Sequence, residues 1–118
     1  MAAITIYHNP GCGTSRNVLA ALRAKGLEPD VVEYLKAGWT EAQLKGLFDR
    51  MGVTPRDVLR VRGTPAEELG LTKPGATDVA ILKAMAAHPI LVERPIVVTA
   101  KGAALCRPAE RLETLLGS

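Results

Sequence analysis

Short apolar runs alternate with amphipathic stretches along this chain. Residues 3–7 (AITIY) form a β-branched run, and a second apolar run follows at residues 31–35 (VVEYL). Between them, residues 17–25 repeat apolar side chains at the spacing of one helix face, and Gly26 is a stop signal. A strand, a helix and a strand over this length predict a βαβ unit, so we expect the two strands to be parallel.

The middle of the chain predicts helices. Residues 40–43 (TEAQ) form a capping box, and apolar residues at i, i+3, i+4 and i+7 continue a helix as far as Gly52. The Thr-Pro pair at 54–55 predicts a short helix with proline at its first position. The same signal predicts a helix over residues 64–70, and a capped helix follows over residues 77–88.

The end of the chain returns to strands. Residues 95–99 (PIVVT) predict a strand, a Lys-Gly turn follows, and residues 103–106 are expected to pair back in an antiparallel hairpin. Residues 107–110 (RPAE) open a final helix that reaches residue 116. The whole pattern, βαβ, helices and then ββα, indicates an α/β fold with a small mixed sheet and helices on both faces.

Composition narrows the class of protein. A chain of 118 residues with 47% hydrophobic content is long enough for one domain with an aliphatic core. A formal net charge of +3 without a dense basic run argues against nucleic acid and favours a small anionic ligand. With two cysteines, no secretory leader and no apolar stretch of membrane-spanning length, we expect a cytoplasmic protein with reduced thiols and no membrane contact. No ligand spacing supports a zinc site.

Cys12 is the residue with the clearest chemistry. It lies in residues 8–16 (HNPGCGTSR), between the first predicted strand and the first helix. Free amide N–H groups and the positive end of a helix dipole favour a thiolate or a bound anion at such a place. A lone cysteine is often only a small buried hydrophobe, but the polar, glycine-rich neighbours favour a reactive thiol.

Lowering the pKa of a thiol increases its reactivity only a few-fold, because nucleophilicity falls with pKa. Most of the rate must come from positioning and charge neutralisation. Position 18 is Val18, so the C-x5-R spacing of phosphatase loops is absent and arginines must come from elsewhere. Three candidates lie at the ends of predicted elements: Arg60, Arg94 and Arg107. Taken alone, each is more often a solvated surface residue.

Four further residues bear on the thiol. His8 could favour the thiolate as an imidazolium, or could simply end a strand. Ser15 stands where a C-x-x-C motif has its second cysteine, so this is a single-thiol loop. Cys106 ends an apolar strand and is interpreted as a buried structural thiol. Pro95 could adopt either peptide isomer.

These residues together resemble the glutaredoxin-linked arsenate reductases, a family with a thioredoxin-like fold. The resemblance covers nearly the whole chain and is carried by residues 4–10 (ITIYHNP), 12–17 (CGTSRN), 67–71 (EELGL), 88–99 (HPILVERPIVVT) and 105–108 (LCRP). It implies a four-stranded mixed sheet with a helical insertion at about 40–88, in a single domain of residues 1–118. Gly11 stands where a close relative has alanine, which we expect to loosen the loop.

The resemblance also implies roles for the site residues. Cys12 would attack the arsenic of arsenate, assisted by His8 and Ser15, and the oxyanion would lie on Arg60, Arg94 and Arg107. Glutathione would act as co-substrate, glutaredoxin would resolve the mixed disulfide, and arsenite would be released. Pro95 would match a structural cis proline beside the loop.

The resemblance further implies a monomer that detoxifies arsenic without a tightly bound cofactor or metal. Two alternatives stay open: a Spx-like regulator that binds RNA polymerase, and a glutathione-linked thiol oxidoreductase without arsenate activity.

Overall fold

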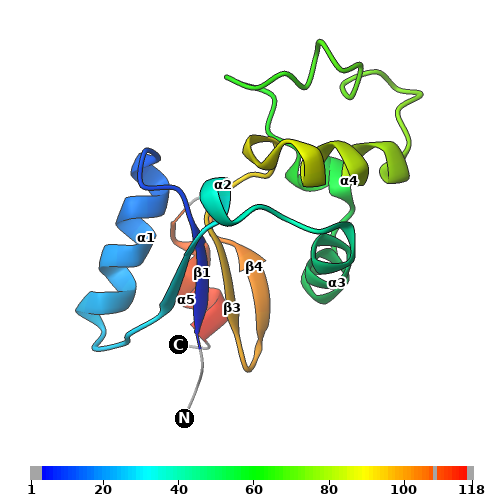
Figure 1. The fold of residues 1–118 in the computed structure, drawn as a ribbon. Helices are drawn as coiled ribbons and strands as arrows, with labels where there is room; N and C mark the ends of the chain where they lie inside the picture. The colour runs from blue at the N-terminus through cyan, green and yellow to red at the C-terminus, as the bar shows by residue number, and fades with distance from the viewer. Residues whose placement is uncertain (1–3, 108, 117–118) are drawn as a thin grey trace. The chain divides into compact units, whose positions relative to one another are not determined.

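The computed structural model describes residues 4–107 and 109–116 (Figure 1). The chain divides into two compact units. One is built from the N-terminal part up to Ala37 together with the C-terminal part from Arg94, and the other is Gly38–Glu93. The second unit contains the segment for which the sequence predicted a helical insertion. That the chain forms a single domain stays a prediction.

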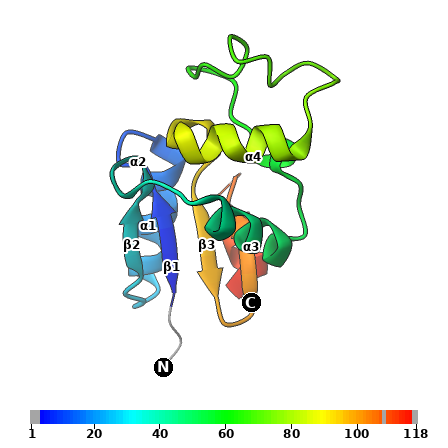
Figure 2. The ribbon, with the colours of Figure 1, turned by 45° about the vertical axis from the view of Figure 1, so that its right-hand side comes forward.

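The first unit is built on a four-stranded mixed sheet with the strand order β2-β1-β3-β4. Its strands are β1 (Thr5–His8), β2 (Asp30–Glu33), β3 (Ile96–Thr99) and β4 (Gly102–Leu105). As predicted, β1 and β2 are parallel and β3 and β4 form an antiparallel hairpin. The β1–β2 pair and the β3–β4 hairpin join into one sheet because β3 pairs antiparallel with β1 (Figure 2). This is the mixed sheet expected of the thioredoxin-like fold.

Two helices pack on one face of this sheet: α1 (Gly13–Ala24) and α5 (Arg111–Leu116). The alternation of β1 buries Ile4 and Ile6 toward them. The rest of this core is likewise fully or almost fully buried, and consists of Val18, Leu22, Val97, Cys106 and Leu112. Helices on the opposite face of the sheet stay a prediction.

The strand predicted over residues 31–35 is present, but its predicted C-terminal end is wrong. β2 stops at Glu33, and Tyr34–Ala37 forms a single helical turn, α2. Glu33 lies opposite His8, the last residue of β1, so beyond this point β2 has no partner for its backbone. The chain turns instead, which buries Tyr34.

The second unit contains α3 (Glu41–Met51) and α4 (Asp78–Ala87). The capping box is present, because the Gln43 backbone N–H donates to Thr40 Oγ1 at 3.1 Å. A left-handed Gly52 ends α3. Thr77 caps α4 through the Ala80 N–H at 3.1 Å, so both helices follow their sequence signals. Two short 3₁₀ helices, η1 (Pro55–Val58) and η2 (Pro89–Leu91), complete the regular structure described in this unit.

The helix predicted over residues 64–70 is absent, and this stretch consists of a bend at 64–65 followed by turns. The Leu71 N–H bonds back to the Ala66 carbonyl at 3.0 Å, and Gly70 takes a positive φ of 74°. This hydrogen bond and the left-handed backbone of Gly70 end the segment as helix C-termini do, so no second helical turn follows. The final helix was predicted to start at residues 107–110, but it begins later, at Arg111. Two residues of the predicted elements lie outside the described residues: Pro108 in this start signal, and Ala3 at the start of the first predicted strand.

We predict that Leu22→Ala lowers the free energy of unfolding by about 2–5 kcal/mol, because it empties a fully buried place between α1 and the sheet. Leu35→Ala is the matched control, since Leu35 in the same unit is 41% exposed and should cost about 1 kcal/mol or less. Urea unfolding measures both values. Equal losses in the two variants would contradict the assigned core.

Candidate active site

Cys12 occupies the N-cap of α1, as the sequence predicted. The helix begins at Gly13, earlier than the apolar pattern indicated. The Cys12 N–H donates to the Asn9 carbonyl at 3.0 Å, and the Cys12 carbonyl accepts the Arg16 N–H at 3.0 Å. The backbone of Cys12 is therefore tied to both the loop and the helix, while its side chain is partly exposed.

Sheet topology brings two distant arginines to this thiol. Because β3 is antiparallel to β1, the start of β3 lies at the end of β1 from which the Cys12 loop leaves. The hairpin returns β4 to the same edge, where the Cys106 N–H donates to the Pro95 carbonyl at 2.9 Å. Arg94 lies two residues before β3 and Arg107 lies two residues after β4, so both meet the loop.

Arg107 reaches the sulfur directly. Its Nη1 lies 3.6 Å from Cys12 Sγ and donates to the Arg94 carbonyl at 3.2 Å. The second contact fixes the guanidinium against the chain that leads into β3. The peptide bond between Arg94 and Pro95 is cis, which answers the question left open by the sequence.

Arg94 is only 7% exposed. Its Nε and Nη1 have no hydrogen-bond partner within residues 4–107 and 109–116. Buried polar groups are nearly always hydrogen-bonded, and a buried cation has a strong need for a partner. Arg94 therefore presents unsatisfied donors at a site that also holds a thiol.

The Cys12 thiol is set up to ionise. Burial by itself would raise its pKa, but three groups act in the opposite direction. They are the backbone N–H of Ser15 and the side chains of Arg107 and Arg94. The net effect places the Cys12 pKa below its ordinary value, which favours the thiolate.

His8 and Ser15 form a buried pair behind the loop. His8 Nδ1 and Ser15 Oγ share a hydrogen bond of 2.6 Å, and Ser15 Oγ also accepts the Asn9 N–H at 3.1 Å. Burial lowers the pKa of His8, although Glu33 opposes this effect. The lowered pKa favours a neutral ring bonded to Ser15 over the imidazolium, which was one of the two roles that the sequence left open.

Arg60 lies in the second unit, where its Nη1 donates to Glu93 Oε1 at 2.9 Å. Both side chains are mostly buried, and the Arg60 N–H also donates to the Leu91 carbonyl at 2.7 Å. The sequence did not reveal this partner, because Glu93 is 33 residues away in the chain. The assignment of Arg60 to an oxyanion stays a prediction.

Cys106 is fully buried in the core of the first unit, as interpreted from the sequence. Burial raises the pKa of this thiol to about 11, although Arg111 acts the other way. A neutral thiol away from solvent is a poor nucleophile. The two cysteines therefore differ in exposure, and their pKa values are shifted in opposite directions.

The sequence reasoning did not single out Asn9, which is hydrogen-bonded to the Cys12 loop. Its Oδ1 accepts the Gly11 N–H at 2.9 Å, a side-chain turn that asparagine often makes. The signal was present in the order strand, asparagine, proline and glycine. Gly11, which was expected to loosen the loop, is held by this bond.

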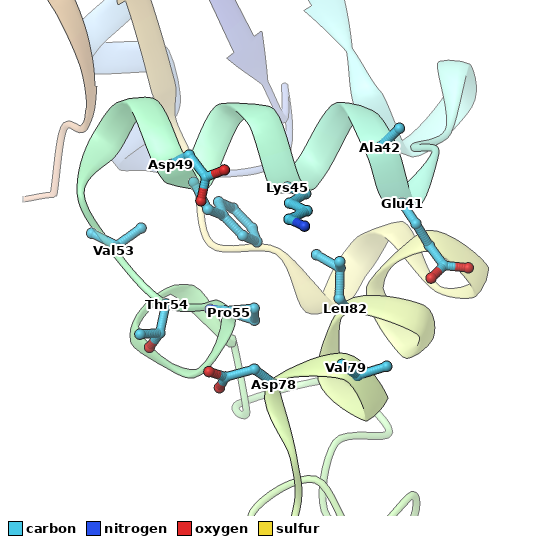
Figure 3. A pocket seen from close by; sticks show the side chains of 11 residues that line it. Glu41, Ala42, Lys45, Asp49, Val53, Thr54, Pro55, Asp78, Val79 and Leu82 are labelled. Atoms are coloured by element: carbon cyan, nitrogen blue, oxygen red, sulfur yellow. The ribbon is translucent and has the colours of Figure 1, made fainter.

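The second unit contains a separate pocket of about 450 Å³ between α3 and α4 (Figure 3). Phe48 and Leu82 form apolar walls, and Glu41, Asp78 and Lys45 are among its charged residues. Neither cysteine lines it. In the described parts of the chain, no group of three or more histidine, cysteine or acidic residues is placed to hold a metal ion, and no helix could cross a membrane.

Comparison with known proteins agrees with this geometry. The model of the ArsC family matches residues 7–115. The chain is 56% identical over 113 residues to the arsenate reductase ArsI2 of Synechocystis, covering 96% of this chain and 81% of that protein. It is 49% identical over 110 residues to the arsenate reductase of Escherichia coli K12, covering 93% and 78%.

Solved structures show the same likeness. The structure of an arsenate reductase from Vibrio cholerae superposes with a TM-score of 0.90 at 38% identity. The match covers 96% of this chain and 97% of that one. A protein from Bacteroides fragilis at 23% identity, with a TM-score of 0.84, shares the fold.

We predict that iodoacetamide modifies Cys12 in the folded protein and leaves Cys106 unmodified. Because the thiolate is the reactive form, the Cys12 rate should fall only as the pH drops through its lowered pKa, below the value of about 8.5 for free cysteine. Mass spectrometry of peptides sampled across pH measures this profile. In urea, both thiols should follow the ordinary profile, and identical native and denatured profiles for Cys12 would refute the assignment.

Proposed function

This chain belongs to the ArsC family, and from that premise we propose that it reduces arsenate to arsenite through a covalent adduct on Cys12. Glutathione and glutaredoxin serve as the electron donors. The enzyme is thus an oxidoreductase that supports arsenic detoxification. Relatives that are 49–56% identical to this chain are named arsenate reductases.

The observation that carries the proposal is the buried guanidinium of Arg94. Its unpartnered Nε and Nη1 lie at a site where Arg107 Nη1 is 3.6 Å from Cys12 Sγ. A tetrahedral oxyanion offers several acceptor oxygens and negative charge, which suits forked guanidinium donors. A bound arsenate ion would accept hydrogen bonds from the free donors of Arg94 and bring an electrophilic arsenic to the Cys12 sulfur.

The first step forms a sulfur–arsenic bond. The Cys12 thiolate attacks the arsenic of dihydrogen arsenate, one As–OH bond breaks, and the leaving hydroxide takes a proton from solvent and departs as water. Arsenic remains As(V) in this adduct, and its oxygens keep one negative charge. Arg94 and Arg107 neutralise that charge, which lowers the barrier for attack by one anion on another.

The second step transfers electrons. The sulfur of glutathione attacks the Cys12 sulfur, the S–As electron pair goes to arsenic, and As(III) leaves as arsenite with the glutathione proton. Cys12 remains as a mixed disulfide with glutathione. Glutaredoxin then takes the glutathionyl group and returns the Cys12 thiol, so two electrons pass to arsenic in total.

The other site residues have supporting roles in this proposal. Ser15 supplies its backbone N–H to the sulfur and ties His8 to the loop. Arg60 is proposed as a third oxyanion ligand, which requires it to leave or share Glu93. No cofactor is tightly bound, and the protein works as a cytoplasmic monomer.

A coupled assay tests the proposal. Purified protein with glutathione, glutaredoxin, glutathione reductase and NADPH should consume NADPH only when arsenate is added. Cys12→Ser should abolish turnover, because an alcohol is a poor nucleophile toward arsenic. Cys106→Ser is the matched control and should retain most activity, since the buried Cys106 takes no part in electron transfer.

Two results would contradict the scheme. Well-folded protein without any arsenate response would favour a glutathione-linked thiol oxidoreductase that uses another oxidised substrate. A folded Cys106→Ser variant without activity would replace the external donors with an internal disulfide relay. A Spx-like regulator predicts binding to RNA polymerase and no arsenate turnover.

A further inference from the structure

Asn9 is hydrogen-bonded to three other residues of the loop and helix start that carry the Cys12 thiol. It follows β1 directly and is 9% exposed. Three groups of this residue make hydrogen bonds within the next six positions. Its Oδ1 accepts the Gly11 N–H at 2.9 Å, its carbonyl accepts the Cys12 N–H at 3.0 Å, and its N–H donates to Ser15 Oγ at 3.1 Å.

This arrangement decides which donors face the sulfur. The backbone N–H groups of Gly11 and Cys12 are both turned back toward Asn9. The Ser15 N–H is the backbone donor that acts on Cys12 Sγ, and Arg107 Nη1 approaches at 3.6 Å. Holding the Cys12 backbone to the loop therefore sets the direction in which its side chain leaves.

The side-chain bond is the part of this network that a substitution can remove. The two backbone bonds of Asn9 persist in any variant with the same main-chain path, whereas the Gly11 N–H depends on Oδ1. The fit is close, because a Cβ added at Gly11 would lie 3.3 Å from that oxygen. Glycine at this position allows the short turn without crowding the carboxamide.

The charge of the acceptor also matters. An aspartate could accept the same N–H, but it would add a negative charge to the loop that carries a sulfur whose ionisation depends on nearby cations. It would also repel an oxyanion from the donors of Arg94. The carboxamide supplies an acceptor oxygen without a charge.

We propose that Asn9 is a positioning residue of the thiol site, whose neutral side-chain oxygen holds the Gly11–Cys12 backbone so that the sulfur faces the Ser15 N–H and Arg107. The effect on arsenate turnover rests on the proposed function. The effect on the sulfur itself does not, because it concerns alignment with donors of this chain.

The test compares three variants at this position with the wild type, and with Asn17→Ala as the matched control on an exposed part of α1. Asn9→Ala removes the acceptor, Asn9→Ser keeps a shorter neutral one, and Asn9→Asp keeps an acceptor but adds a charge. The primary readout is the rate of Cys12 alkylation by iodoacetamide as a function of pH, with thermal unfolding recorded in parallel.

We expect the Asn9→Ala profile to move to higher pH, with alkylation several-fold slower at pH 7, and Asn9→Ser to recover part of that loss. Asn9→Asp should fold and still react more slowly than Asn9→Ser at pH 7. Asn17→Ala should match the wild type. If Asn9→Ala does not fold, the comparison of Asn9→Ser with Asn9→Asp still decides the matter.

Two outcomes would overturn the proposal. A lower melting temperature with an unchanged alkylation profile would leave Asn9 a purely structural role. Equal reactivity of the wild type and Asn9→Asp would remove the need for a neutral oxygen. Alkylation requires no arsenate, so a wild type that fails to reduce arsenate would refute the proposed function and leave this comparison intact.

Discussion

A buried guanidinium without an anion is costly, and the site of this protein is organised around one. Arg94 is 7% exposed, and two of its nitrogens lack partners in the described chain. Such a group creates a demand for negative charge. The Cys12 thiolate meets part of that demand, and an oxyanion would meet the rest. Arg94 thus acts on both events: it helps the Ser15 N–H and Arg107 to lower the Cys12 pKa, and it offers donors to an oxyanion.

The fold creates this situation by the order of its strands. β1 delivers the Cys12 loop to one edge of the sheet, and the antiparallel β3–β4 hairpin brings both of its ends to the same edge. Arg94 and Arg107 flank the hairpin, so residues far apart in sequence converge without any long excursion. The core of Ile6, Val18 and Leu22 fixes the sheet against α1, which keeps Cys12 at the start of that helix.

Much of this could be predicted from local signals. Capping residues at Thr40 and Thr77 marked the starts of two helices, and the glycine-rich stretch placed Cys12 at a third. The ends of predicted strands pointed to Arg94 and Arg107. The residues predicted well are those whose signal lies within a few positions of the feature itself.

The features that the sequence left open or missed have the opposite character. The end of β2 depends on where its partner β1 stops, and the turns after Thr64 depend on a bond from Leu71 to Ala66. The state of His8 depends on its burial, and the partner of Arg60 is 33 residues away. None of these could be predicted from local pattern, because each is decided by tertiary contacts. Asn9 had a local signal whose importance became visible only with its three hydrogen bonds.

The most direct test of the central claim is the equilibrium binding of arsenate to the Cys12→Ser protein, in which no covalent step can occur. Calorimetry should show saturable binding, and adding Arg94→Ala should weaken it by at least about tenfold, the loss of a charge-assisted hydrogen bond. Arg23→Ala, which removes an exposed arginine from α1, should leave the affinity unchanged. Equal affinity with and without Arg94 would show that the buried guanidinium does not hold the oxyanion.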